Sequence, residues 1–361
     1  MIKAQVQTNP HYGKKPSDQT LSERLQECLI LIDKPAGPTS HQVDAWVKNI
    51  FDTTKVGHAG TLDPRVTGVL PIGVGRATRG LQVLIHAGKE YVGVMKFHAD
   101  VSEKKIREIQ SNLVGDITQL PPVRSAVKRV KRKRKIYYFD IIEIEGRDVL
   151  FRVGCEAGTY IRTLCVDIGK KLGVGAHLAE LRRTRVGNFS EQMLIKLQDV
   201  LDAFVFYKED GLEKPLFDLL YPFEALLDPL PKIIIRDSAV DAICHGADLA
   251  LPGVAAVDSA IKKDDTVAVM TLKDEGVMIG RAMYTSEEII EKDTGMCVQS
   301  ERVFMKKGTY PSIWKNINII ALLPCLLFIL PRWLSLVRRE TGNLVRNFPH
   351  RSSNLLLGVI L

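Results

Sequence analysis

The sequence predicts a protein of the α/β (α+β) class, in which a mixed α/β domain precedes a small C-terminal β-barrel. The first observation is size, because 361 residues with 45% hydrophobic and 25% charged residues fit two globular domains. The second is that helical and strand-like hydrophobic periods alternate as far as a proline-rich passage at residues 221–231. The third is the change after this passage to short strands separated by Gly and Asp turns, predicted at residues 232–236, 266–272, 277–283 and 301–305.

The first domain is expected to begin with a buried strand, a turn and an amphipathic helix. Residues 28–32 are apolar and predict the strand, and two prolines within residues 34–38 preset the turn. Ser40 is a candidate N-cap of the helix. Residues 55–71 are rich in Gly, Thr and Pro without a regular period, which predicts a long ordered loop of the kind that carries function. The helix is predicted to bury a stripe at the i, i+3, i+4, i+7 spacing, formed by Val43, Trp46, Val47 and Ile50.

Further strands and helices are expected to complete this domain. A strand at residues 89–98 is predicted to place Tyr91, Gly93, Met95 and Phe97 on one face. The other expected elements are a helix at residues 78–87, a hairpin formed by residues 136–145 and 148–155, and a helix at residues 158–172.

Cysteine usage favours a reducing, cytoplasmic setting. The six cysteines form no C-x-x-C pair and no compact Cys/His cluster, so the sequence suggests neither a zinc ribbon nor a disulfide framework.

Residues 1–13 lack the pattern of a secretory signal. The apolar run at residues 317–330 is shorter than the roughly 17–25 residues that cross a bilayer, so we expect no membrane span. Residues 315–361 differ in character from the rest and are set aside as an atypical tail of unknown status.

The strongest local signal for chemistry lies around Asp63, within residues 57–71 (GHAGTLDPRVTGVLP). Glycines let the backbone approach a ligand closely, and a residue that precedes proline is pushed toward extended geometry. Asp63 precedes Pro64, so its carboxylate is expected to project from the loop. The alternative is that Asp63 only caps a turn.

Five ordered motifs give the chain a resemblance to the TruB family of pseudouridine synthases. They are residues 34–40 (KPAGPTS), 57–71, 89–91 (KEY), 158–164 (GTYIRTL) and 181–187 (LRRTRVG). Within that family the chain is most similar to the archaeal relatives of dyskerin, the catalytic subunit of H/ACA ribonucleoproteins. That closer resemblance is carried by residues 8–13 (TNPHYG), 121–129 (PPVRSAVKR) and 244–253 (CHGADLALPG).

The resemblance implies the isomerisation of uridine to pseudouridine in RNA, without a cofactor or a metal. It implies a mixed-sheet pseudouridine synthase catalytic domain followed by a PUA domain, an RNA-binding β-barrel. The domains are then an N-terminal extension at residues 1–20 that packs on the PUA domain, the catalytic domain at 21–230, the PUA domain at 231–314 and the tail at 315–361.

The resemblance also assigns the catalytic residues. Asp63 matches the essential carboxylate, which adds to the base or the sugar or removes a sugar proton; the sequence leaves these routes open. Tyr91 matches the tyrosine that stacks on the extracted base and assists removal of the C5 proton; the alternative is a core aromatic residue. Arg162 matches the basic partner that keeps Asp63 ionised and oriented; the alternative is a solvated surface arginine.

Three more residues match substrate-binding positions. His58 matches a histidine that helps to flip the base, or else it only forms hydrogen bonds within the loop. Leu181, with Arg182 beside it, matches the position where an apolar side chain closes over the base, or else Leu181 is ordinary helix core.

RNA binding is expected at two surfaces. The net charge of +8 is unevenly spread, because residues 124–135 hold eight basic residues and no acid. Such runs are often solvated mobile segments, but this one follows Pro121 and favours a phosphate-contacting loop, which Arg182, Arg183 and Arg185 extend. The second surface, implied by the resemblance, is the PUA segment that holds the guide RNA. The candidate contacts are Arg124, Lys128, Arg129, Lys131 and Arg132 in the first surface, and Gly246, Ala247, Leu249 and Gly253 in the second.

The target stays open between guide-directed modification of rRNA, with small H/ACA proteins as partners, and unguided action on the T-loop uridine of tRNA. A second class of function is a catalytically silent RNA-binding scaffold, against which the set of Asp63, Tyr91 and Arg162 argues. A third is a hydrolase that uses Ser40 and His41, which is disfavoured because adjacent helical residues point in different directions.

Overall fold

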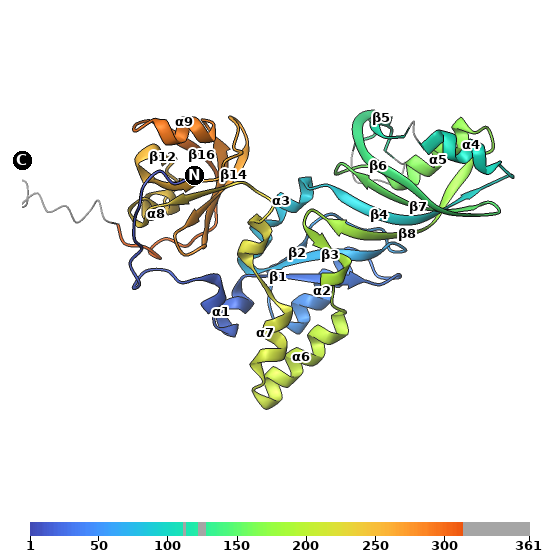
Figure 1. Cartoon of the computed structure of the whole chain (residues 1–361). Helices are drawn as coiled ribbons and strands as arrows, with labels where there is room; N and C mark the ends of the chain where they lie inside the picture. The colour runs from blue at the N-terminus through green and yellow to red at the C-terminus, as the bar shows by residue number, and fades with distance from the viewer. Residues whose placement is uncertain (111–112, 122–127, 313–361) are drawn as a thin grey trace, which may run out of the picture. The chain divides into compact units, whose positions relative to one another are not determined.

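The computed structural model describes residues 1–110, 113–121 and 128–312 (Figure 1). Arg124 and the tail at residues 315–361 therefore lie outside the described residues. Residues Met1–Tyr310 form one compact unit. Within the described part of the chain, no helix has the length and apolar character needed to cross a membrane.

A ten-stranded mixed sheet is the frame of the N-terminal part. Its order is β10-β1-β3-β8-β4-β7-β6-β5, with β2 added to β3 and β9 added to β8. The β3–β8 pair is parallel, and the other pairs are antiparallel. The strands are β1 (Cys28–Lys34), β2 (Val56–His58), β3 (Thr67–Val74), β4 (Lys89–Phe97), β5 (Gly115–Gln119), β6 (Arg132–Glu145), β7 (Asp148–Cys155), β8 (Ala176–Val186), β9 (Phe189–Ser190) and β10 (Tyr221–Pro222).

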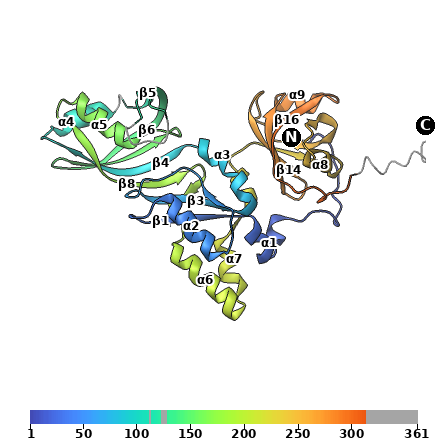
Figure 2. The same ribbon diagram turned by 180° about the vertical axis from the view of Figure 1, so that it is seen from behind.

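The two halves of this sheet have separate cores. In the first half Val43, Val47 and Val200 pack with Ile30 and Leu70, so α2, α6 and α7 cover β1 and β3, as both ribbon views show (Figures 1 and 2). In the second half α4 and α5 pack on β4, β6 and β7. The helices are α1 (Leu21–Gln26), α2 (Ser40–Ile50), α3 (Leu81–His86), α4 (Glu103–Gln110), α5 (Ile161–Lys171), α6 (Leu197–Asp210) and α7 (Glu213–Leu219).

The C-terminal part contains a six-stranded sheet of order β12-β16-β15-β14-β11-β13. Its own core holds buried side chains such as Ile233, Val267, Val277 and Val298. The elements are β11 (Lys232–Ile235), α8 (Asp237–Cys244), β12 (Leu249–Ala250), β13 (Val254–Val257), β14 (Thr266–Thr271), β15 (Gly276–Ala282), α9 (Ser286–Glu291) and β16 (Met296–Val303).

The N-terminal segment lies along this second sheet. The amino group of Met1 donates to the Val257 carbonyl at 2.6 Å, and the Lys3 amide donates to the Ala255 carbonyl at 2.9 Å. Further along, the Thr8 hydroxyl donates to the Asp237 carboxylate at 3.0 Å. The segment thus extends the sheet beside β13 before the chain enters α1.

A shared apolar cluster joins the two sheets. Met270 and Phe304 of the C-terminal part pack in one cluster with Leu29, Val69 and Phe223 of the N-terminal part. The Phe223 and Phe304 ring centroids are 4.8 Å apart. One face of the small sheet is therefore buried against the larger domain.

Three expectations about α2 and the loop after it were wrong. Trp46 is 43% exposed while Val43 and Val47 are fully buried, because a short helix on a twisted sheet buries a narrower stripe than the spacing suggested. The N-cap is Thr39, whose hydroxyl accepts from the Gln42 amide at 3.1 Å. The expected loop at residues 55–71 contains β2 and the first part of β3, because its glycines pair in strands without giving an apolar period.

Three later expectations also need correction. The basic run is not a loop throughout, since Arg132 to Lys135 pair with β5 at the start of β6. Leu181 lies in β8 rather than in a helix. The region expected as one helix at residues 78–87 is a 3-10 turn, Gly75–Arg79, followed by α3.

Candidate active site

Asp63 lies on a tight turn between β2 and β3. The Val66 amide donates to the Asp63 carbonyl at 3.0 Å, which closes the turn. Ser40 fixes the residue before it, because its hydroxyl accepts from the Leu62 amide at 2.9 Å and donates to the Leu62 carbonyl at 3.2 Å. This double contact occupies the Ser40 hydroxyl, which argues further against Ser40 as the nucleophile of a hydrolase.

Lys34 secures the other side of the turn. Its buried ammonium donates to the carbonyls of Pro64 at 3.0 Å and Val66 at 2.9 Å, and to the Pro35 carbonyl at 2.9 Å. The Gly37 amide also donates to the Pro64 carbonyl at 2.9 Å. The residues 34–40 are thus the support that presents Asp63, and this explains why that motif and the Asp63 loop occur together.

Asp63 meets Arg162 across the sheet. The carboxylate is 57% exposed, and Arg162 Nη2 forms an ion pair with Asp63 Oδ2 from the first turn of α5. Gln119 positions the start of that helix, because its side chain accepts from the Tyr160 amide at 3.0 Å and donates to the Tyr160 carbonyl at 3.2 Å. The predicted pairing of Asp63 and Arg162 is therefore present in the structure.

Tyr91 lies on β4 beside this pair and is half-buried. Burial raises the pKa of its phenol, while a hydrogen bond with Arg183 opposes the shift and the charge of Asp63 adds to it. The phenol is therefore protonated at neutral pH. Its neighbours across the sheet are Val153 and Arg183.

Arg183 is a site residue whose exposure was predicted wrongly from the sequence. We expected it to extend the RNA-binding surface, yet it is 1% exposed. Its Nε donates to the Val69 carbonyl at 2.8 Å, and its guanidinium contacts Tyr91. Gly68 lies opposite Arg183 in the parallel β3–β8 pair with a φ of +99°, and a Cβ there would come within 2.2 Å of the Arg183 carbonyl oxygen. The alternation of side chains along a strand could have indicated the burial of Arg183, because it turns Arg182 and Arg183 to opposite faces of β8.

Three buried cations lie near the loop that carries Asp63, namely Lys34, Lys89 and Arg183. Lys89 donates to the carbonyls that end α3, and burial followed by the charge of Arg183 lowers its pKa to about 8. The same two causes lower the pKa of Lys34. Positive charge held in a low-dielectric interior attracts anionic groups such as phosphate.

His58, at the end of β2, makes two hydrogen bonds. Its Nδ1 is 2.7 Å from Asp44 Oδ2 and its Nε2 is 3.0 Å from Thr61 Oγ1. These contacts hold the His58 side chain beside the Asp63 loop. This position agrees with both hypotheses for His58, namely that it only forms hydrogen bonds within the loop and that it helps to flip the base.

Leu181 and Arg182 take different positions. Leu181 is half-buried and packs beside Tyr91 against the core of the second half of the sheet. Arg182 bridges two carboxylates, Asp33 at 2.9 Å and Glu191 at 3.0 Å. The Arg182 guanidinium is thus occupied by ion pairs.

The expected RNA contacts fall at two places. Lys128, Arg129 and Lys131 are exposed, whereas Arg132 is half-buried. At the end of α8, Gly246 and Ala247 are exposed, and Gly246 has a φ of +94°. Leu249 is buried in the core, so its side chain faces away from solvent. A Cβ on Gly253 would come within 2.9 Å of Ala239 Cβ, so that glycine lets α8 pack closely.

Comparison with known proteins identifies the family. Residues 48–161 match the N-terminal domain of the TruB family pseudouridylate synthases, and residues 162–228 match the tRNA pseudouridylate synthase B C-terminal domain. Residues 231–304 match the PUA domain and residues 1–44 the DKCLD domain. A relative from Methanopyrus kandleri named "Probable tRNA pseudouridine synthase B" is 55% identical over 87% of this chain and 93% of its own length. The chain belongs to the TruB family.

Solved structures agree with this result. A chain of the "Crystal Structure of a Cbf5-Nop10-Gar1 Complex" is 53% identical, with a TM-score of 0.82 over 86% of this chain and 95% of that one. The "Structure of H/ACA RNP bound to a substrate RNA containing 2'-deoxyuridine" gives 50% identity and a TM-score of 0.81, over 87% of this chain and 96% of that one. A second curated relative, from Pyrococcus furiosus, is 53% identical over 86% of this chain and 92% of its own length. The mixed-sheet synthase fold with a PUA domain is thereby confirmed, and the family makes the chain an isomerase.

Proposed function

We propose that this TruB-family protein isomerises uridine to pseudouridine in RNA, with Asp63 as the essential carboxylate. The observation that carries the proposal is the presentation of Asp63 on a fixed turn, paired with Arg162 and beside Tyr91. An exposed carboxylate that is secured from below by Lys34 and Ser40 is placed to meet a base from solution.

The reaction needs three events at the uridine. The bond between N1 and the ribose C1′ breaks, the uracil rotates while it stays bound, and C5 joins C1′; C5 then loses its proton and N1 gains one, so that substrate and product are isomers. Asp63 serves as nucleophile or base in the first event, and Arg162 orients it through their ion pair. Tyr91 stacks on the base; its raised pKa supports this role over that of a proton acceptor, since the phenol keeps its proton.

The base must leave its stack before it reaches Asp63. In our proposal His58 assists this extraction and Leu181 closes over the base, since both lie beside the Asp63 and Tyr91 positions. Arg182 was expected to contact the base with Leu181. In our proposal it instead stabilises β8 through its ion pairs with Asp33 and Glu191.

We propose that guide RNA and small H/ACA proteins are the partners. The support is the similarity to chains solved as a Cbf5-Nop10-Gar1 complex and as an H/ACA RNP with substrate RNA. In this proposal residues 21–230 form the catalytic domain, residues 231–314 the PUA domain that holds the guide, and residues 1–20 the extension packed on it. Action on tRNA is the second candidate target, because the curated relatives carry that name. Five buried cysteines support a cytoplasmic location.

A reconstitution assay tests the target. The purified protein is incubated with unmodified tRNA and, separately, with an rRNA fragment plus guide RNA and the small proteins, and pseudouridine is quantified by nucleoside chromatography. We expect product on rRNA only with the complete set. Product on tRNA from the protein alone assigns the stand-alone activity, and absence of product in every arm contradicts the proposed function.

The basic segment supplies a separate prediction. We expect the double variant Lys128→Ala, Arg129→Ala to weaken RNA binding about equally for different sequences, because these side chains contact phosphates. Each lost contact lowers the slope of log affinity against log salt by about 0.7–0.9. The measurement is a filter-binding titration at several salt concentrations. The charge-matched control is a second double variant on α6 and α7, Lys208→Ala with Lys214→Ala. An equal loss of RNA affinity in that control contradicts the assignment.

A further inference from the structure

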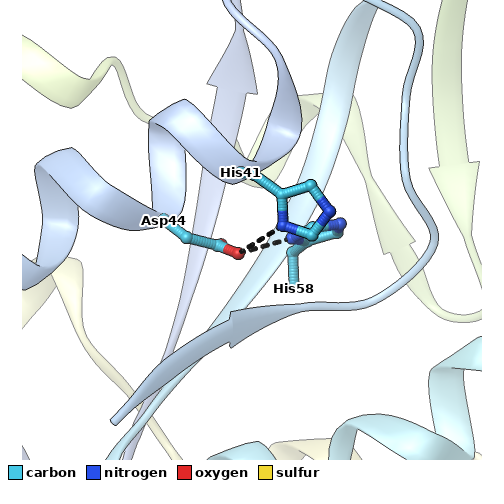
Figure 3. A group of neighbouring side chains, drawn as sticks. All are labelled: His41, Asp44 and His58. Atoms are coloured by element: carbon cyan, nitrogen blue, oxygen red, sulfur yellow. Dashed lines mark hydrogen bonds and ion pairs between the residues drawn. The ribbon is translucent and has the colours of Figure 1, made fainter. Parts of the chain in front are cut away.

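A second group of side chains with ligand chemistry lies next to the Asp63 loop. Figure 3 shows His41 and Asp44 on one helix, α2, turned toward His58 on β2. His41 Nδ1 is 3.9 Å from Asp44 Oδ2, and His58 Nδ1 is 2.7 Å from the same oxygen. One ligand atom from each residue lies within 4.8 Å of the other two.

Asp44 carries the observation that points to a missing ligand. Its side chain is 10% exposed, and its Oδ1 is buried without a hydrogen-bond partner among the described residues. A buried carboxylate oxygen without a partner is costly, and a cation at this place would satisfy it. Neither His58 nor His41 supplies this contact, because both face Oδ2.

The spacing suits a transition metal. A tetrahedral Zn²⁺ with ligand distances of about 2.0–2.1 Å separates its ligand atoms by about 3.3 Å. The observed separations from Asp44 Oδ2 lie on either side of this value, and the 81% exposed His41 side chain is free to close the longer one. Two imidazoles and a carboxylate with one open position form a zinc-type donor set.

Thr61 completes the arrangement. A histidine that binds a metal through one ring nitrogen usually donates its other N–H to an oxygen, which fixes the ring. When His58 Nδ1 faces the metal, its Nε2 lies 3.0 Å from Thr61 Oγ1 and supplies this second contact.

We propose that His41, Asp44 and His58 bind one divalent transition-metal ion of the Zn²⁺ type, with water in the open position. The ion replaces the short contact between His58 and Asp44 Oδ2 and takes both oxygens of the Asp44 carboxylate, so that the unpartnered Oδ1 gains a partner. Its effect on catalysis rests on the proposed function: a metal that captures His58 removes it from base extraction, so bound metal inhibits pseudouridine formation.

The first test measures binding alone, without RNA. The full chain is freed of metal and titrated with Zn²⁺ by calorimetry and with Co²⁺ by visible absorption. We expect one ion per chain and a Co²⁺ spectrum without thiolate charge-transfer bands, because the donors are nitrogen and oxygen. His41→Ala and Asp44→Asn should each weaken binding by at least about tenfold. His41 is exposed, so its variant reports on binding even where the Asp44 variant folds poorly.

A matched control separates this site from another histidine pair. His98 Nε2 lies 3.0 Å from His177 Nδ1 on a different part of the surface. His177→Ala should leave the stoichiometry unchanged. Absence of binding to the wild type, equal binding by His41→Ala, or loss of binding in His177→Ala instead each overturns the proposal.

The second test measures activity. Zn²⁺ should inhibit the wild type in the reconstitution assay and spare the His41→Ala variant, whose activity without metal should equal that of the wild type. Inhibition that is equal in both proteins contradicts the link to His58. Because binding is measured separately, failure of the isomerase assignment and failure of the metal site give different results.

Discussion

Replacement of Asp63 by asparagine is expected to lower pseudouridine formation by about 10⁴-fold or more while RNA affinity stays within about twofold. Asparagine keeps the size of the side chain and the turn closed by the Val66 amide, but it removes the charge that pairs with Arg162 and the oxygen that attacks or accepts a proton. Single-turnover assays with saturating protein measure the chemical step, and electrophoretic shifts measure affinity.

Asp210→Asn is the matched control, because Asp210 is an exposed carboxylate at the end of α6, remote in sequence from the motifs. It should retain full activity. Product from the Asp63→Asn protein at the wild-type rate would mean that the carboxylate is not essential. Inactivity of the wild type itself, with RNA binding retained, would favour the scaffold reading.

Lys34→Met is expected to lower stability by about 2–4 kcal/mol and to lower kcat more than KM changes. The substitution keeps a long apolar side chain but leaves the Val66 carbonyl without its Lys34 donor and the Pro64 carbonyl with the Gly37 amide alone, and an unsatisfied buried carbonyl costs about 1–3 kcal/mol. The Asp63 turn then loses its support on one side, while the surfaces proposed to hold RNA are unchanged. Chemical denaturation gives the free energy of unfolding, and steady-state kinetics gives the two constants.

The control for this variant is Lys105→Met on the exposed face of α4. It loses the same charge without losing a buried donor, so stability and kinetics should stay near the wild type. A Lys34→Met protein that is as stable as this control, or that changes only KM, would show that Lys34 does not support the turn.

Local pattern predicted much of the fold. The apolar run of β1, the face of β4 and the stripe of α5 follow from simple periodicity, and the structure confirms these strands and this helix. The Gly-rich sequence around Asp63 and Pro64 predicted a projected carboxylate, but the resemblance to the TruB family was needed to choose a catalytic role over a turn cap.

Long-range pairing explains what the sequence could not show. Arg183 is buried because β8 runs parallel to β3 and brings it against Gly68, a contact between residues far apart in the chain. The same holds for the His41, Asp44 and His58 group, since only the packing of α2 on β2 brings them together. Alternation along β8 separates the faces of Arg182 and Arg183, but no pattern within a short window identifies the strand or the helix that each group packs against.

The shared cluster around Phe223 and Phe304 bears on how the chain folds. A fragment that ended near residue 230 would expose Leu226 and Phe223 to water, and such patches promote aggregation. We therefore expect the two modules, which are separate in sequence, to melt as one cooperative unit. A substitution that destabilises the small sheet is then expected to destabilise the synthase domain as well, even when the substituted residue lies far from the turn that carries Asp63.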